Sequence, residues 1–125
     1  MLIGQTIFSA TTSATVYYSP WFPRGGNRGR MTCNVVAAMN VDDFKIVVES
    51  KNSESDDVVT GANTWTSGSI TLTANSETSW KAGASVDSTD PGLLELVRFR
   101  YELKADSGAL GRIHFRMLPP QWFTN

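Results

Sequence analysis

Cysteine and histidine are nearly absent from this sequence of 125 residues, which contains one of each, Cys33 and His114. One cysteine excludes a disulfide within the chain, so stability must come from a buried apolar core. One histidine excludes a metal site built from several histidines of one chain. The sequence also contains no Gly-x-Ser-x-Gly motif, no Cys-x-x-Cys pair and no phosphate-binding glycine loop. These absences predict a protein that is not an enzyme and that needs no metal or other cofactor.

Long apolar segments are missing as well. No segment approaches the roughly 20 apolar residues of a membrane-spanning helix, and residues 1–5 lack the basic flank and apolar core of a signal peptide. We therefore expect no membrane partner and a location in the cytoplasm or in a virion. Eleven basic and 12 acidic residues give a net charge of −1, which argues against a domain that mainly neutralises phosphates. The composition favours protein partners over nucleic acid.

What the sequence does have is alternation of apolar and charged residues, which is clearest in the segments 97–104 and 112–117. A period of two places one set of side chains inside and the other in solvent, as in a half-buried β-strand. We predict two long antiparallel strands that lie next to each other. The predicted inner face of this pair comprises Val97, Phe99, Tyr101, Leu103, Ile113, Phe115 and Met117. Its predicted outer face is a positive stripe of Arg98, Arg100, Arg112, His114 and Arg116.

Further segments are rich in threonine, valine, isoleucine or aromatic residues. They predict strands near 6–8, 14–18, 31–39, 44–50, 69–73 and 79–82, with a continuous buried apolar run at 35–39. Polar turn residues separate them, as at 40–43 and 87–92. No apolar period of 3.6 residues persists for three turns, so we expect little helix. Seven to nine short strands over residues 1–125 are typical of an all-β, single-domain antiparallel β-sandwich with jelly-roll or Greek-key connections.

Two segments depart from the strand pattern. Residues 19–30 contain two prolines and three glycines, which predicts an exposed loop. Residues 118–125 include a Pro-Pro pair that cannot donate hydrogen bonds to a sheet, which predicts an extended C-terminal tail. Both segments contain aromatic residues and the first also contains three arginines, and these residue types are enriched in protein interfaces. We expect neighbouring subunits to order both segments. The candidate interface residues are Trp21, Phe22, Arg24, Arg28, Arg30, Trp122 and Phe123.

Other residues allow alternative interpretations. The arginine and aromatic residues of the segment 19–30 also resemble the composition of single-strand nucleic-acid sites. Cys33 and His114 could form a nucleophile and base, but a cysteine in an apolar run is more typical of a structural side chain. Six carboxylates cluster without the spacing of a calcium loop and predict an acidic surface patch. They are Asp42, Asp43, Glu49, Glu54, Asp56 and Asp57.

In its size, its Ser/Thr-rich strands, its start at Met1 and its aromatic segments, the chain resembles small virion proteins of bacterial viruses that have a β-sandwich or jelly-roll subunit. The resemblance rests on no diagnostic motif, so it assigns no site residue. It implies a coat, decoration or tail-associated structural protein without catalytic activity. Such a protein self-assembles or decorates a larger particle, and its partners are copies of itself or another particle protein.

The alternative is a carbohydrate-binding β-sandwich module. In that case Trp21, Trp65, Trp80 or Trp122 would stack on sugar rings, while aspartate or asparagine side chains would orient the hydroxyl groups. Three exposed, coplanar tryptophans would favour this alternative, whereas tryptophans buried between chains would favour assembly.

Overall fold

The computed structural model describes residues 4–52, 64–83, 92–107 and 109–123. As the alternation predicts, these residues form β-strands and no helix. The part of the chain so described therefore has no helix that is long and apolar enough to cross a membrane. Its ten strands are β1 (Gly4–Ser9), β2 (Thr15–Tyr18), β3 (Phe22–Pro23), β4 (Arg28–Met39), β5 (Val41–Lys51), β6 (Thr64–Thr66), β7 (Ser76–Gly83), β8 (Leu96–Ala105), β9 (Gly111–Met117) and β10 (Gln121–Phe123).

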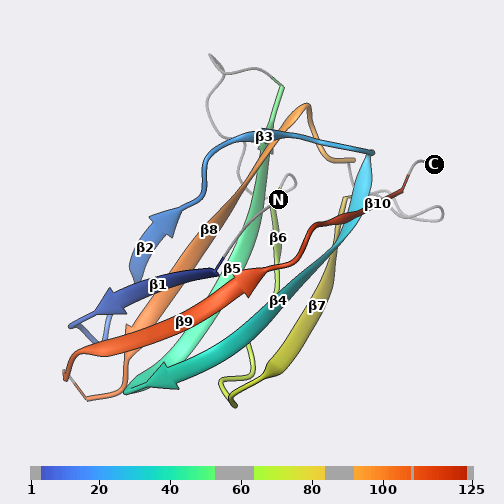
Figure 1. The fold of residues 1–125 in the computed structure, drawn as a ribbon. Coiled ribbons are helices and arrows are strands. Elements are labelled where there is room, and N and C mark those ends of the chain that lie inside the picture. Colours follow the sequence, from blue (N-terminus) through green and yellow to red (C-terminus); the bar gives the residue numbers. More distant parts are fainter. Residues whose placement is uncertain (1–3, 53–63, 84–91, 108, 124–125) are drawn as a thin grey trace.

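The strands form two antiparallel sheets that pack against each other, which confirms the predicted β-sandwich (Figure 1). Sheet A has the order β1-β9-β4-β7, and β10 continues along the edge of β4 that β9 occupies. Sheet B has the order β2-β8-β5-β6, and β3 continues along the edge of β8 that β2 occupies. Because β3 and β10 count as separate strands, the described residues contain ten strands, above the seven to nine predicted.

Four nested strand pairs give the sandwich its jelly-roll connectivity. From the ends of the chain inward, β1 pairs with β9, β2 with β8, β4 with β7 and β5 with β6. Successive pairs fall alternately in sheet A and sheet B. The chain therefore wraps around one core as a folded ribbon, which is the arrangement of a double-sheet jelly roll.

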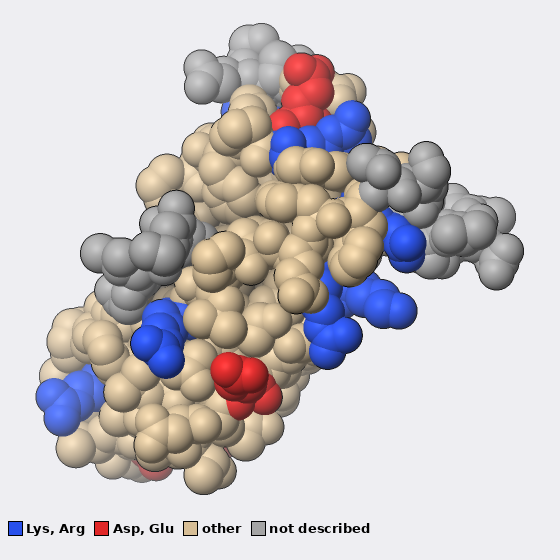
Figure 2. Space-filling model, turned by 45° about the vertical axis from the view of Figure 1, so that its right-hand side comes forward, with Lys and Arg blue, Asp and Glu red and all other residues tan. Residues whose placement is uncertain are grey.

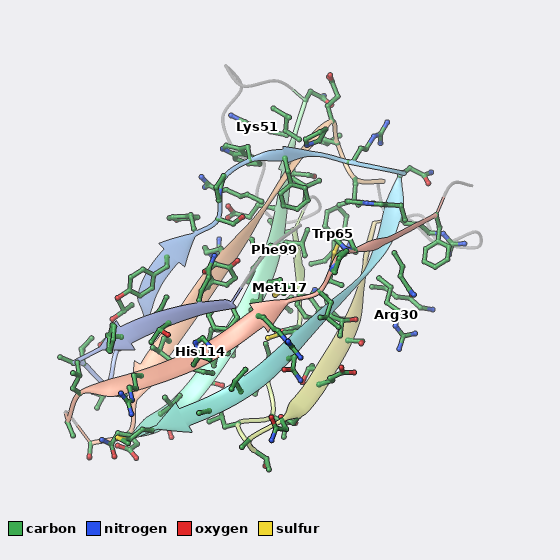
Figure 3. All side chains as sticks on the ribbon, in the orientation of Figure 1. Arg30, Lys51, Trp65, Phe99, His114 and Met117 are labelled. Carbon is green, nitrogen blue, oxygen red and sulfur yellow. The ribbon has the colours of Figure 1, made fainter. Side chains whose placement is uncertain are left out.

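The two alternating strands have the predicted inner faces but do not lie next to each other. All seven predicted inner residues are buried, yet β8 belongs to sheet B and β9 to sheet A. The predicted adjacency is therefore wrong. The two inner faces oppose each other across the core, where the ring centroid of Phe115 lies 4.9 Å from those of both Phe44 and Tyr101. Figure 3 shows Phe99 and Met117 on opposite sheets of this core.

Strand β4 departs from the predicted burial at a β-bulge. Its register shifts between Val35 and Ala37, so that Ala37 and Met39 point outward and are exposed. The apolar run 35–39 is thus buried only in part. The turn predicted after it is shorter than expected, because Asn40 alone, with a φ of 57°, leads from β4 into β5.

The segment 69–73 alternates as predicted but is not a strand. Ile70 is buried, and its N–H donates to the carbonyl oxygen of Phe44 at 2.8 Å. This bond joins the segment to β5, and Ser76 donates to the carbonyl oxygens of Thr71 and Thr73, so the segment is held without being a strand. Of the turn predicted at 87–92, residues 87–91 lie outside the described residues, as do Glu54, Asp56 and Asp57 of the predicted acidic patch.

Candidate interaction surfaces

The segment 19–30 is less exposed and less irregular than predicted. Ser19 is buried and forms two hydrogen bonds of 2.9 Å with the backbone of Phe99, one through its N–H and one through its side-chain oxygen. The short strand β3 then pairs with β8 at Val97 and Leu96. Since β4 begins at Arg28, most of this segment is bound to the sheets of its own chain.

The tail from residue 118 onward also returns to its own chain. Strand β10 pairs with the start of β4, with Trp122 opposite Gly29. The Trp122 ring packs against the core and lies 6.5 Å from the Phe22 ring, centroid to centroid. The prediction that the tail leaves the sheet is therefore wrong beyond the Pro-Pro pair. Neighbouring subunits are not needed to order this tail as far as Phe123.

Glycines of the arginine-rich segment allow the close approach of the tail. A Cβ atom on Gly25 would lie 2.6 Å from Cγ of Trp122, and one on Gly29 would lie 3.2 Å from Cε3 of the same ring. A Cβ atom on Gly26 would collide with the backbone of Phe123. The absence of side chains at these glycines lets the tail pack against the segment. This packing weakens the interpretation of the segment as a flexible nucleic-acid loop.

The three arginines of this segment have different environments. The Arg24 side chain donates to the carbonyl oxygen of Leu93 and fixes the segment to the start of β8. The Arg28 guanidinium lies over the Phe123 ring, 5.2 Å from its centroid. Arg30 projects from β4 into solvent and has no hydrogen bond or ion pair with any described residue (Figure 3). Of these three arginines, Arg30 is therefore the one whose charged group can most readily contact a partner, and the Phe123 ring is still 44% exposed beside Arg28.

Trp21 belongs to a cation–π cluster on the outer face of sheet B. The Arg98 guanidinium lies 4.0 Å from the ring centroid of Tyr18 and 4.6 Å from that of Trp21. The Lys51 ammonium lies 4.5 Å from the Trp21 ring, and Lys51, labelled in Figure 3, is buried. Each such contact contributes about 0.5–2 kcal/mol, depending on how far the cation is desolvated. This tryptophan is accordingly a structural contact within the chain.

Glu49 does not contribute to an acidic patch, because two arginines neutralise it. Its carboxylate is 3% exposed and accepts hydrogen bonds from Arg98 at 2.8 Å and Arg100 at 2.6 Å. Arg100 also pairs with Glu102 at 2.9 Å. The part of the predicted positive stripe that lies on sheet B is thus balanced by carboxylates of the same strands.

Sheet A carries a different charge pattern on its outer face. Five cations point outward from β4, β7 and β9, and none forms an ion pair with the described residues. One carboxylate, Glu77, shares this face among the described residues. The predicted positive stripe is therefore divided between two surfaces, and its sheet A part forms no ion pair with a carboxylate of the described residues. Figure 2, which brings β7 and β10 forward, shows blue side chains spread over this side of the molecule. The five cations are Arg28, Arg30, Lys81, Arg112 and Arg116.

Apolar side chains gather at the other end of the same face. Phe8, Arg112 and Met39 stand side by side on β1, β9 and β4. Leu110 is brought close by a hydrogen bond of 3.3 Å from the Asn40 amide to its carbonyl oxygen. Phe8, Met39 and Leu110 are 43%, 50% and 57% exposed, and we call them the apolar patch. Beside it, the bulge in β4 leaves a hollow of about 180 Å³ lined in part by Arg112 and Met39.

Sequence reasoning did not select the residues of the apolar patch or Lys81. Phe8 and Met39 are apolar residues in strands, and nothing in the sequence pattern indicates that they point outward. Lys81 is opposite Arg30 only through the pairing of β7 with β4. The outward position of Met39 therefore depends on the bulge in β4, and that of Lys81 beside Arg30 depends on the pairing of β7 with β4.

Cys33 and His114 do not come together. Cys33 is fully buried between the sheets, whereas His114 is exposed on the outer face of sheet A and hydrogen-bonds Thr6 at 2.8 Å. Burial raises the pKa of the Cys33 thiol to about 12, so the thiol stays protonated at neutral pH. The described residues also contain no group of three or more His, Cys, Asp or Glu side chains that could hold a metal ion.

The raised pKa of Cys33 makes folding stability depend on alkaline pH. The unfolded thiol ionises near pH 9, but the folded thiol does so only near pH 12, so the unfolded state gains stability above pH 9. The free energy of unfolding should fall by about 1.4 kcal/mol from this thiol between pH 8 and pH 10. Urea denaturation at both pH values would measure the loss. The fall should be smaller by that amount in Cys33→Ala, and an equal fall in both proteins would contradict the assignment.

The tryptophans do not form a platform for a sugar. All four are partly buried, and Trp65, Trp80 and Trp122 pack against the hydrophobic core. Trp21 contacts the cations of the sheet B cluster. The three exposed, coplanar tryptophans that would favour a carbohydrate-binding module are therefore not present among the described residues.

Comparison with known proteins gives no family for this chain. No protein-family model and no curated protein matches it.

Proposed function

We propose that this chain is a non-enzymatic structural protein that self-assembles or decorates a larger particle, as virion coat and decoration subunits do. The observation that carries the proposal is the apolar patch, where three large apolar side chains at one end of sheet A are 43–57% exposed. Exposed apolar clusters on a soluble domain mark contact sites, because their burial against a partner removes apolar surface from water.

A second exposed apolar surface supports assembly between copies of the chain. Val16 and Tyr18 point outward from β2, on the outer face of sheet B, and are 42% and 52% exposed. The apolar patch and this β2 surface lie on different sheets. Contacts between two different patches are heterologous, and they close into rings and shells or extend into fibres. Double-sheet jelly rolls occur in viral capsid domains, although they also occur in lectins and cupins, so the fold alone does not decide the function.

The test places charge in the apolar patch and measures the mass of the particle in solution. Met39→Asp combined with Leu110→Asp should reduce the assembly to a species near 13.7 kDa while retaining the circular dichroism of the parent. Buried unpaired charge in a contact costs several kcal/mol, enough to dissociate it. The matched control is Thr66→Asp combined with Thr71→Asp, which adds the same charge at two exposed positions away from the patch. Assembly of the patch variant at the parent's mass would reject this surface.

A further inference from the structure

We infer that the end of sheet A opposite the apolar patch binds single-stranded nucleic acid. The surface, called the basic face, comprises Arg28, Arg30, Lys81, Arg116 and Phe123. This inference does not depend on self-assembly, since a monomer would present the same side chains.

Uncompensated charge is the first observation that supports the inference. Arg30 and Lys81 are exposed and lie directly opposite each other on β4 and β7. Like charges in this arrangement repel, so the pair destabilises the free protein. On sheet B the same chain places carboxylates beside its outward arginines. Because no carboxylate of the described residues pairs with Arg30 or Lys81, the pair is suited to an anionic ligand that supplies the missing charge.

The fixed geometry of two further arginines supports the same ligand. The Arg116 guanidinium donates to the side-chain oxygen of Asn34 at 3.2 Å, which holds it over the middle of β4. The Arg28 Nε is buried and has no hydrogen-bond partner among the described residues, so any contact of Arg28 with a ligand is left to its terminal nitrogens. A guanidinium group can bind two phosphate oxygens at once, and Arg116 uses only its Nε in the bond to Asn34.

The aromatic residue distinguishes single strands from other polyanions. Phe123 is 44% exposed, and Arg28 covers its ring at 5.2 Å. Single-strand sites combine a positive surface that follows the phosphates with aromatic rings and arginine planes on which unpaired bases stack. An acidic protein surface would satisfy the cations but would make no use of the exposed part of the Phe123 ring. We therefore favour a single strand over an acidic protein.

The experiment measures fluorescence anisotropy of labelled oligo(dT) of 12 nucleotides with the full chain at several salt concentrations. Four phosphate contacts predict that the logarithm of the binding constant falls with the logarithm of salt concentration with a slope of about −2.8. Arg30→Ser combined with Lys81→Ser should weaken binding at least tenfold and reduce the magnitude of the slope by about 1.4. Both positions are exposed, so folding should be retained, and circular dichroism would verify it.

The matched control removes two cations from the opposite sheet. Lys45→Ser combined with Lys104→Ser changes the net charge equally, but these residues project from the outer face of sheet B. This control should bind as the parent does. Phe123→Leu should weaken binding about tenfold without changing the salt slope, because it removes stacking and not charge.

Three outcomes would overturn the inference. They are absence of oligo(dT) binding at low salt, an equal loss of affinity in the control with two lysines replaced, and binding of poly-glutamate as tight as that of oligo(dT). The last result would identify an acidic protein as the partner of this surface.

Discussion

Phe115→Ala is expected to lower the free energy of unfolding by about 3–5 kcal/mol, because it leaves a cavity that the surrounding core cannot fill. Phe115 is fully buried on β9 and contacts Phe44 and Tyr101 of the opposite sheet, with ring centroids 4.9 Å apart in each pair. Loss of the ring therefore weakens the packing between the two sheets as well as the packing within one sheet. Urea denaturation followed by tryptophan fluorescence would measure the change.

Phe8→Ala is the matched control for this prediction. Phe8 is on β1, the neighbour of β9, but points outward and is 43% exposed. Its loss should cost about 1 kcal/mol or less, which is the range of strand propensity on an exposed face. Equal losses for the two phenylalanines would contradict the assignment of inner and outer faces.

Arg98→Met combined with Arg100→Met is the second change with a large expected effect. It leaves the Glu49 carboxylate, which is 3% exposed, without the two cations that now bind it at 2.8 and 2.6 Å. Removing the partners of a buried charge typically costs about 3–5 kcal/mol, because the charge can be neither paired nor solvated. Chemical denaturation at pH 7 would measure the loss.

Two further variants separate charge from packing in this network. Adding Glu49→Met to the double variant should recover most of the lost stability, since replacement of a whole buried ionic group by apolar residues is often neutral. Glu102→Gln should cost less than about 1 kcal/mol, because its pair with Arg100 is about one quarter exposed. Failure of Glu49→Met to recover stability would show that the loss comes instead from the packing of Arg98 on Tyr18 and Trp21.

Alternation in the sequence predicts the orientation of side chains in this fold but not the partners of each strand. Every second residue of β8 and β9 is buried as the pattern predicts. The same pattern is compatible with two neighbours in one sheet and with two strands that face each other across a core. The choice is made by contacts between distant residues, such as β1 with β9 and β2 with β8, and one segment taken alone carries no information on them.

The candidate surfaces were difficult to predict for the same reason. The aromatic residues of the segment 19–30 and of the tail look exposed because prolines and glycines surround them. The contact of Trp122 with Gly25 joins residues about 100 positions apart, and it converts both segments into part of the sandwich. Conversely, the bulge in β4 turns Met39 outward, although it ends an apolar run that predicts burial.

Sedimentation velocity of the unmodified protein over a wide range of concentrations tests the proposed self-assembly most directly. If the exposed apolar surfaces join copies of the chain, the protein should sediment as a species several times larger than 13.7 kDa. The fraction of the protein in this species should rise with protein concentration. A single species of 13.7 kDa at every concentration, including the highest that stays in solution, would contradict self-assembly.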